Sequence, residues 1–351
     1  MIYRILAASY SNNVTTLTFD DEKQTLHATE SLTIGHHPSW LTSDPKYPSM
    51  VWTGLEQADG KIVALKFDQQ GKGTIVGETT AGGKDPCHLV VVKGELVFAN
   101  YSSGIVGSLP LSVDSCQLPV TPDILKLGGS GPDKSRQEAS HPHQVYDLAE
   151  RDELLIPDLG GDAVYRLKKM QTGDWSIVGH IGFEAGGGPR HVVYHNGDLY
   201  TLLELSSKVV RHRFPPPPEK PKFVASKPTM SNPPPQPNNM LAAEILLPPP
   251  NASFPAPYLY LSNRNDPSPE GDIISIFSVE NSEGLELVDE IRTGLSHVRG
   301  IVFGGPDDKY LIAGGANSGG VKLFERINGG KALKEIAFER SIEAPTGFLW
   351  L

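Results

Sequence analysis

The stretch that decides the fold is Ser140–Leu167, SHPHQVYDLAERDELLIPDLGGDAVYRL. Apolar and polar residues alternate from Gln144 to Leu148, and a second apolar run covers Leu154–Ile156. The turn-forming sequence Pro157–Gly161 then leads into a third run, Ala163–Leu167. Short runs with a period of two, separated by turn residues, predict neighbouring strands of an antiparallel sheet.

The chain repeats this arrangement of an apolar strand that ends in a polar residue, a tight turn and a second strand. The copies are Tyr3–Ser9 with Val14–Phe19, Met50–Glu56 with Lys61–Phe67, Glu95–Asn100 with Ile105–Leu111, Glu153–Asp158 with Ala163–Leu167, Asp198–Glu204 with Lys208–Phe214, Tyr258–Arg264 with Asp272–Val279, and Lys309–Asn317 with Val321–Ile327. A further strand is expected before each copy, most clearly at Cys87–Val92, His143–Leu148, His191–His195, Ala242–Leu247 and Val298–Phe303.

A period of about 50 residues is typical of β-propeller blades with four strands each. The 36 glycines and 30 prolines among 351 residues suit a fold with many turns. We expect the β-prone tail, Ala344–Leu351, to complete the first blade, because a ring that closes leaves no open sheet edge. The sequence therefore predicts one all-β domain over residues 1–351, a seven-bladed β-propeller with four-stranded antiparallel blades. Two stacked β-sandwiches are the alternative, but the repeat is long for sandwich strands.

Two proline-rich stretches interrupt the repeat. Residues 215–240 contain PPPPEKP and NPPPQPNN, and we expect them to form an insertion between blades, since dense proline favours an extended, unpaired backbone. The second stretch, Pro248–Pro257, is interpreted as an enlarged hairpin loop. A ligand for a proline-binding domain is the alternative to a stiff surface loop.

Composition excludes several functional classes. A net charge of −10 lacks the basic footprint of a nucleic-acid binder. No apolar run reaches the roughly 18 residues of a membrane span. Residues 1–13 have no long apolar core or cleavage site, so they are expected to be a strand and not a signal peptide. We therefore expect a cytoplasmic protein in which Cys87 and Cys116 are reduced thiols.

Polar residues recur at two positions of the repeat that a propeller brings together at its central channel. Those near the starts of repeats are His37, His88, His141, His143, Arg190 and Arg299. Those at the ends of second strands are Asn100, Asp158, Glu204, Asn263, Arg264 and Asn317. Structural roles are open for some of them, because Asx residues before tight turns bond their own backbone and buried histidines can have satisfied hydrogen bonds.

Glu204 and two arginines dominate the expected chemistry. Glu204 lies among leucines, where a carboxylate is costly unless it is paired, so we expect an arginine partner. Arg190 follows three glycines and a proline, and Arg264 lies between two asparagines. Two guanidinium groups, a carboxylate and an imidazole suit an anionic, oxygenated substrate and proton transfer near pH 7. The dispersed acidic residues give no metal-ligand spacing, so no metal or cofactor is expected.

Seven motifs carry a resemblance to a known family: HPH at 141–143, PDLGGDAVYR at 157–166, GPRHVVYH at 188–195, YLYLSNR at 258–264, VRGIVF at 298–303, NSGGVKLF at 317–324 and ANYSSGIVGSLPL at 99–111. Together they resemble the seven-bladed propeller lactonases, which include 6-phosphogluconolactonases and the fungal carboxy-cis,cis-muconate cyclase. The resemblance spans nearly the whole chain outside the proline insertion.

The resemblance implies a catalytic set of His143, Arg190, Glu204 and Arg264, with His141 as the alternative imidazole. Candidates for substrate binding are His37, His88, His141, Asp158, Asn263, Arg299 and Asn317. The chain departs from the family where Arg264-Asn265-Asp266 replaces Arg-Gly-His and Ala8-Ser9-Tyr10-Ser11 replaces Gly-Thr-Tyr-Thr. These departures concern the identity of the substrate more than the type of reaction.

The leading functional hypothesis is hydrolysis of a small anionic or sugar-acid lactone. Glu204 or His143 would take a proton from water, and Arg190 and Arg264 would stabilise the oxyanion and bind the anionic group of the substrate. The second hypothesis is cyclisation of a carboxylated muconate to a lactone, or its reverse. The third is a non-catalytic propeller scaffold whose proline-rich segment recruits a partner.

Overall fold

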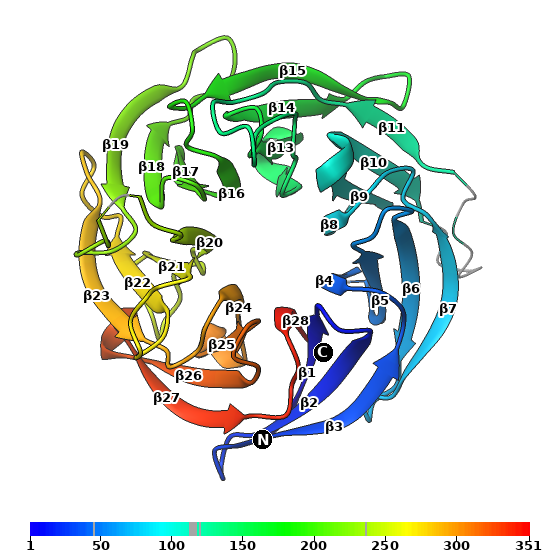
Figure 1. Ribbon diagram of the computed structural model, residues 1–351, viewed down its shortest axis with the longest axis vertical. Helices are drawn as coiled ribbons and strands as arrows, with labels where there is room; N and C mark the ends of the chain where they lie inside the picture. The colour runs from blue at the N-terminus through cyan, green and yellow to red at the C-terminus, as the bar shows by residue number, and fades with distance from the viewer. Residues whose placement is uncertain (45, 112–117, 119–120, 236) are drawn as a thin grey trace. The chain divides into compact units, whose positions relative to one another are not determined.

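The computed structural model describes residues 1–44, 46–111, 118, 121–235 and 237–351. Their regular structure consists of 28 strands, β1 to β28, and four short 3-10 turns, with no α-helix among the described residues. The strands form seven four-stranded antiparallel sheets, and strands that follow each other in the chain lie side by side (Figure 1). The exception is β28, which pairs with β1.

The bounds of the strands are as follows, sheet by sheet. The first sheet contains β28 (Pro345–Trp350), β1 (Ile2–Ser9), β2 (Asn13–Asp20) and β3 (Thr25–Thr33). The second contains β4 (Pro38–Asp44), β5 (Tyr47–Leu55), β6 (Lys61–Phe67) and β7 (Gly73–Thr80). The third contains β8 (Pro86–Val92), β9 (Glu95–Asn100), β10 (Ile105–Pro110) and β11 (Asp123–Lys126). The fourth contains β12 (Tyr146–Leu148), β13 (Glu153–Asp158), β14 (Ala163–Lys169) and β15 (Trp175–Gly182).

The remaining three sheets follow the same order. The fifth contains β16 (Pro189–His195), β17 (Asp198–Leu203), β18 (Lys208–Arg213) and β19 (Lys222–Pro228). The sixth contains β20 (Leu241–Leu246), β21 (Tyr258–Arg264), β22 (Ile273–Ser278) and β23 (Glu286–Arg292). The seventh contains β24 (Val298–Gly304), β25 (Tyr310–Gly315), β26 (Val321–Ile327) and β27 (Ala332–Glu339). The 3-10 turns are η1 (Tyr101–Ser103), η2 (Ala149–Arg151), η3 (Pro306–Asp308) and η4 (Asn328–Gly330).

The sequence prediction of seven four-stranded blades is confirmed, including the placement of the C-terminal strand beside β1 in the first blade. The reason is the distribution of apolar residues within each repeat. The second strands β13 and β21 are buried along their whole length, whereas the outer strands β3 and β7 are mostly exposed or half-buried. Central strands therefore have nearly continuous apolar sequences, and outer strands carry the polar residues.

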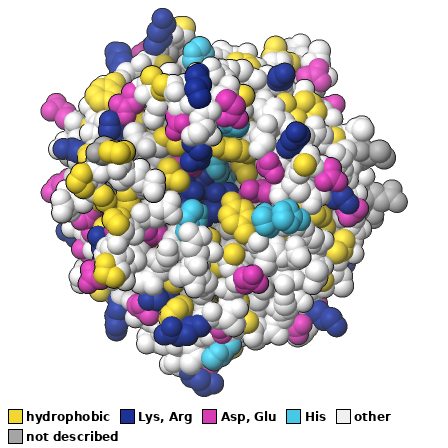
Figure 2. Space-filling view, viewed as in Figure 1, with side chains coloured by type: hydrophobic (Ala, Val, Ile, Leu, Met, Phe, Trp, Pro, Cys, Tyr) yellow, Lys and Arg dark blue, Asp and Glu magenta, His cyan; other side chains and the backbone are white. Residues whose placement is uncertain are grey.

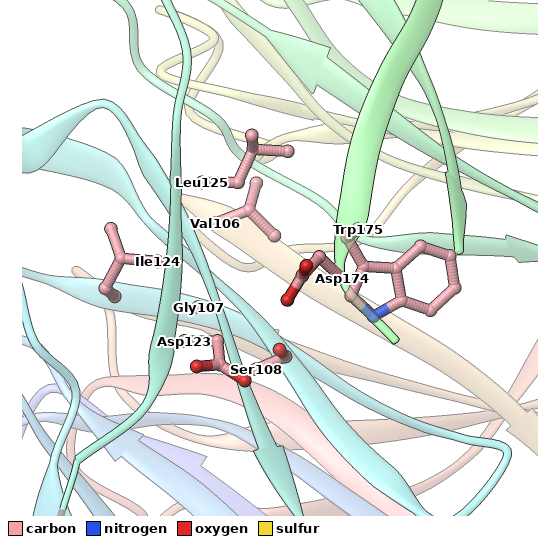
Figure 3. A pocket seen from close by; sticks show the side chains of 8 residues that line it. All are labelled: Val106, Gly107, Ser108, Asp123, Ile124, Leu125, Asp174 and Trp175. Carbon is pink, nitrogen blue, oxygen red and sulfur yellow. The ribbon is translucent and has the colours of Figure 1, made fainter. Parts of the chain in front are cut away.

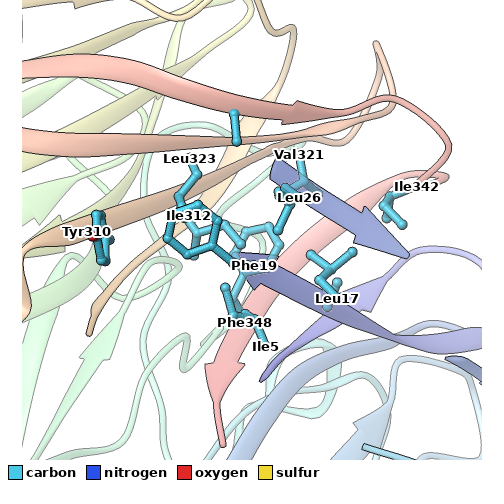
Figure 4. Close-up of a cluster of buried hydrophobic side chains, with 12 residues drawn as sticks. Ile5, Leu17, Phe19, Leu26, Tyr310, Ile312, Val321, Leu323, Ile342 and Phe348 are labelled. Atoms are coloured by element: carbon cyan, nitrogen blue, oxygen red, sulfur yellow. The ribbon is translucent and has the colours of Figure 1, made fainter. Parts of the chain in front are cut away.

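The chain divides into two compact units. The first comprises Met1–Ala7, Thr15–Thr29 and Val193–Trp350, and the second comprises Ala8–Val14, Glu30–Val192 and Leu351. In the first unit, one core cluster joins Phe19 of β2 to Tyr310 of β25 with ring centroids 5.1 Å apart (Figure 4). Phe348 of the C-terminal strand belongs to the same cluster, which ties the last strand to the first blade by packing as well as by pairing.

In the second unit, the core between the third and fourth sheets is built from β-branched and aliphatic side chains. Val97 and Val106 of the third sheet pack with Leu154 and Ile156 of the fourth, all fully or nearly fully buried. The predicted inner strand His143–Leu148 is shorter than expected, because only Tyr146–Leu148 pairs regularly with β13. The preceding residues make only an isolated bridge, from Pro142 to Asp158.

The predicted insertion at 215–240 needs a correction. Lys222–Pro228 form β19, which pairs with β18 as the outer strand of the fifth sheet. An outer strand tolerates proline because one of its edges makes no hydrogen bonds to a neighbouring strand, so the missing N–H group is not needed there. The flanking residues are connections, and Met230 and Met240 anchor the second of them by packing on Ile273. We call residues 229–235 and 237–240 the strap.

The second proline-rich stretch is the expected connection between β20 and β21. Asn251 Nδ2 donates to the carbonyl of Asp307 at 3.0 Å, and Ser253 Oγ donates to Asp307 Oδ2 at 2.6 Å. Phe254 is 3.8 Å from the guanidinium carbon of Arg326. These contacts hold the loop against the seventh sheet, so it is a packed surface loop.

The surface seen in Figure 2 carries acidic and basic side chains interspersed with one another, without a broad area of one sign. No helix among the described residues is long and apolar enough to span a membrane. Cys87 is a buried free thiol, and Cys116 lies outside the described residues.

Candidate active site

Arg190 and His143 meet in the second unit. Arg190 is the second residue of β16 and is 2% exposed, and His143 is 5% exposed. Arg190 Nη1 contacts the His143 ring, with Nδ1 at 3.0 Å and Nε2 also in contact. A guanidinium group can only donate, so the imidazole accepts and is neutral in this arrangement. The sequence prediction that these two residues come together is therefore matched in this unit.

Two more buried histidines and a tryptophan surround this pair. His191 lies with its ring centroid 5.4 Å from that of His143 and 5.5 Å from that of His88. Trp40 packs against His88 at 4.3 Å. His88 Nδ1 accepts from the backbone N–H of Val145 at 3.3 Å. Burial holds the pKa of His88 well below its usual value, and the nearby His191 and Arg190 add to the effect, so His88 stays neutral.

His141 and Asp158 are occupied by contacts within the protein. Asp158 accepts four hydrogen bonds, from Ser140 Oγ and from the backbone N–H groups of residues 141, 160 and 161. His141 has Nδ1 2.9 Å from the carbonyl oxygen of Tyr101 and Nε2 3.1 Å from Glu138 Oε1. Burial raises the pKa of Asp158 although these donors oppose the shift. This geometry fits the turn-stabilising alternative considered for Asp158.

His37 lies apart from the Arg190–His143 pair in a stack of three rings. Its centroid is 3.6 Å from that of His36 and 5.1 Å from that of Tyr10. Partial burial and the neighbouring His36 lower the pKa of His37. No described contact links His37 to Arg190, so it is a half-buried surface residue of the second unit.

Glu204 and Arg264 form a buried ion pair in the first unit. Glu204 directly follows β17 and is 1% exposed, and Arg264 ends β21 and is 4% exposed. Arg264 Nη2 lies 2.7 Å from Glu204 Oε2 and donates to the carbonyl of Ala242 at 3.0 Å. The expected arginine partner of Glu204 is therefore Arg264. Arg264 Nε is buried and has no hydrogen-bond partner among the described residues.

The surroundings of this pair are held by β20 and by the strap. The N–H of Ala242 donates to the carbonyl of Glu204 at 3.2 Å. Thr229, the first residue of the strap, donates through its N–H to the carbonyl of Ser207 at 2.9 Å and through Oγ1 to Asn263 Oδ1 at 2.6 Å. Thr229 thus joins the turn that follows Glu204 to the strand end that carries Arg264.

The other predicted binding residues of the first unit differ in burial. Asn263 is fully buried, and its Nδ2 has no partner among the described residues. Arg299 in β24 is 9% exposed. Asn317 is exposed in the turn after β25.

Three residues near the predicted site residues were missed by the sequence reasoning: His191 lies beside His143, Trp40 beside His88, and Thr229 beside Asn263. His191 directly follows Arg190, and alternation along a strand favours only one of two neighbours as site-facing. Trp40 has the pattern of an ordinary core residue. Thr229 lies in the proline-rich region that was expected to be an insertion. Only His191 carried a usable signal, because it is part of the GPRHVVYH motif.

A cavity of about 200 Å³ is lined by none of these residues (Figure 3). It is lined by β10, β11 and the start of β15, with the carboxylates of Asp123 and Asp174 and the ring of Trp175. It contains no histidine or arginine, so it lacks the groups that the expected chemistry needs. Among the described residues, no group of three or more histidine, cysteine, aspartate or glutamate side chains could hold a metal ion.

The chain is similar in sequence and in fold to proteins of one known family. The family model described as "Lactonase, 7-bladed beta-propeller" matches residues 4–350. The chain belongs to the lactonase family. The family predicted from the seven motifs is thereby confirmed.

Two relatives of this lactonase-family chain carry the same name. A 6-phosphogluconolactonase of Bacillus subtilis is 27% identical over 325 residues, which cover 90% of this chain and 88% of the relative. A 6-phosphogluconolactonase of Formosa agariphila is 28% identical over 305 residues, which cover 84% and 82%. A solved structure of a protein from Lactobacillus plantarum aligns over 100% of both chains with a TM-score of 0.86 at 23% identity, which supports the fold.

Proposed function

We propose that this member of the lactonase family hydrolyses a sugar-acid lactone that carries an anionic group, as a phosphogluconolactone does. The observation that carries the proposal is the presence of two buried pairs, Arg190 with His143 and Glu204 with Arg264, in a chain of this family. The names of the two relatives supply the substrate class. We propose that the reaction needs no metal or cofactor and that the protein acts in the cytoplasm.

The proposed reaction assigns one role to each group. Glu204 or the neutral His143 takes a proton from water, which attacks the lactone carbonyl. Arg190 donates to the oxyanion that develops on the carbonyl oxygen, and the remaining N–H groups of Arg264 bind the anionic group. The ring oxygen then leaves and takes up a proton, which gives the open hydroxy acid. Donors aimed at an oxyanion each contribute about 3 kcal/mol to lowering the barrier.

Hydrolysis of a panel of charged and neutral aldonolactones tests the proposal. We expect turnover of the charged lactones, reduced by a factor of about 100 or more in Arg190→Ala and Glu204→Gln. The same preparations should be mixed with a carboxylated muconate, because loss of its diene absorbance would assign the cyclase reaction instead. Turnover of neither substrate, or turnover that both substitutions leave unchanged, would contradict the proposed hydrolysis.

A further inference from the structure

A second polar cavity lies at the opposite end of β17 from Glu204. Its volume is about 380 Å³, and its walls are the ends of β16, β17 and β18 and the residues that follow β22. β17 begins at Asp198 and ends immediately before Glu204. At about 3.3 Å per residue, roughly 20 Å of strand separates the two ends. The cavity is therefore distinct from the Glu204–Arg264 pair within the same unit.

Tyr200 supplies an unpaired hydroxyl group to this cavity. The residue lines the cavity but is 1% exposed overall, and its hydroxyl has no hydrogen-bond partner among the described residues. Burial raises the pKa of Tyr200 to about 12, so the group stays protonated and can donate. A tyrosine this deeply buried normally bonds through its hydroxyl. The hydroxyl of Tyr200 is therefore available to donate a hydrogen bond to a ligand.

Arg213 and His195 provide further donors at the same cavity. Arg213 and Arg211 are two residues apart on β18 and pair in register with Asp198 and Tyr200 of β17, so all four side chains lie on one face. Arg213 Nη1 is 3.1 Å from Asp198 Oδ1, and its side chain is 46% exposed, which leaves its other N–H groups accessible.

His195 is a donor through its second ring nitrogen. Its Nε2 lies 2.9 Å from Asn196 Nδ2, and burial lowers the pKa of His195, so the imidazole is neutral. Since an amide nitrogen only donates, Nε2 accepts and Nδ1 carries the proton. His195 therefore adds an N–H donor to the cavity that Tyr200 and Arg213 also line.

Two acidic residues, Asp198 and Glu280, and two arginines, Arg211 and Arg213, line the cavity, so its charges balance. Arg211 offsets Asp198, to which it donates through Nε at 2.9 Å and Nη2 at 2.5 Å, and its Nη1 donates to the carbonyls of residues 281 and 284. Arg213 remains as the additional positive charge. Glu280 lies exposed at the lip, where it disfavours ligands with several negative charges. Apart from Glu280, the walls thus offer hydrogen-bond donors and the positive charge of Arg213.

We propose that this cavity binds a small organic carboxylate with hydroxyl groups, at a site separate from the Glu204–Arg264 pair. The carboxylate accepts from Arg213 and from Tyr200, and the hydroxyl groups contact His195 and the polar lip. The volume falls within the range of about 300 to 1,000 Å³ that is usual for small-molecule sites. A planar guanidinium group matches a carboxylate better than it matches a monatomic anion.

Calorimetric titration with sodium D-gluconate tests the proposal. Arg264→Ala serves as the background, because it removes the arginine at the other end of β17. We expect gluconate to bind this protein, and we expect Tyr200→Phe or Arg213→Gln to weaken binding about tenfold, since each removes a hydrogen bond to a charged group. Tyr200→Phe keeps the ring 5.5 Å from Arg211, so its packing should be preserved.

Controls separate this site from other effects. Tyr310→Phe, in the seventh sheet, removes a buried tyrosine hydroxyl elsewhere in the unit and should leave gluconate affinity unchanged. Arg213 is half-exposed, so Arg213→Gln should fold even if Tyr200→Phe does not. Three results would overturn the proposal: no gluconate binding to Arg264→Ala, affinity unaffected by both substitutions, or tighter binding of inorganic phosphate than of gluconate. None of them depends on lactone hydrolysis.

Discussion

β17 has a buried acidic residue at each end, and the two are paired in different ways. At its start, Asp198 is held by Arg211 and Arg213 of the adjacent strand in the same sheet. Directly after its end, Glu204 is paired with Arg264 of the next sheet. Arg211 uses three of its nitrogens in hydrogen bonds, whereas Arg264 Nε is buried without a partner among the described residues.

The repeat shows which of these pairs is part of the framework. In the fourth sheet, Glu153 at the start of β13 is held by Arg166 and Lys168, in the same positions as the partners of Asp198. At the place where Glu204 follows β17, by contrast, β9 and β13 are followed by the uncharged Tyr101 and Leu159. A buried pair that recurs in two blades stabilises the blade. A pair that occurs once and leaves a donor unused is a candidate for function.

The largest effect is expected from Arg211→Met. It leaves Asp198 buried beside the half-exposed Arg213, and removing one partner of a buried pair costs about 3 to 5 kcal/mol. We therefore expect the free energy of unfolding to fall by about that amount, with no loss of activity per folded molecule. Denaturant unfolding and lactone turnover of the same preparation measure the two quantities.

Arg166→Met is the matched variant in the fourth sheet. If the two pairs are the same structural element, its unfolding free energy should fall by an amount within about 1 kcal/mol of that for Arg211→Met. An unfolding midpoint equal to that of the wild type for either variant would show that the repeated pair does not stabilise the blade. The Asp198–Arg211 pair could then no longer serve as the structural reference for the Glu204–Arg264 pair.

A lysine substitution at each end should separate the two roles. In Arg264→Lys one ammonium group can still contact Glu204 and the carbonyl of Ala242, but the donors of Nε and Nη1 are lost. We expect kcat/KM to fall about 100-fold, with a change in unfolding free energy below about 1 kcal/mol. In Arg211→Lys we expect a large fall in unfolding free energy and little change in kcat/KM, because the single ammonium group of lysine cannot replace hydrogen bonds from three nitrogens. Equal effects on activity at both ends would contradict the distinction.

The seven blades could be predicted because each repeat carries its own signal. β13, β21 and β26 begin and end at the predicted residues, since each is an apolar run bounded by turn residues. β19 was missed because the prolines at 221 and 228 predict an unpaired backbone, and the FVAS run between them is too short to predict a strand by itself. Local sequence cannot show that a proline-bounded segment pairs at an outer edge.

The candidate site could be predicted in part. Glu204 stood out because a carboxylate among leucines needs a partner, and Arg264 is that partner. Trp40 could not be found, because its role depends on rings from β4, β8 and β16 packing together. Asp158 was proposed to bind substrate, yet its oxygens already accept hydrogen bonds from residues 140, 141, 160 and 161, which only coordinates can show.

A smaller effect is expected at Thr229, which holds Asn263 beside Arg264. In the third sheet Asn100 occupies the position that corresponds to Asn263, and Ala81 the position that corresponds to Thr229. There the amide is oriented so that Asn100 Nδ2 donates to the carbonyl of Ala81 at 2.8 Å. The hydroxyl of Thr229 turns the amide of Asn263 the other way. In Thr229→Ala we expect the amide to reverse, Arg264 to shift, and kcat/KM to fall about tenfold, or 1.4 kcal/mol.

Thr229→Ser keeps the hydroxyl and should restore kcat/KM, while Asn100→Ala removes one buried hydrogen bond at the equivalent place. We expect Asn100→Ala to lower the unfolding free energy by about 1 kcal/mol without the loss of kcat/KM. If Thr229→Ala lost stability but kept wild-type kcat/KM, Thr229 would belong with the framework at the other end of β17.

The smallest effect concerns His88, which has Arg190 and His191, not a carboxylate, as its charged neighbours. The folded-state pKa of His88 is well below 6.5, so between these values the unfolded chain binds a proton that the folded protein does not. Stability should therefore fall as pH drops, by roughly 1 kcal/mol between pH 6.5 and 5.5 from this residue. His88→Gln should remove that part of the pH dependence in denaturant titrations, whereas the exposed His36→Gln should not. An unchanged slope in His88→Gln would mean that this imidazole is charged in the folded protein and would require a carboxylate partner like those of the two ion pairs.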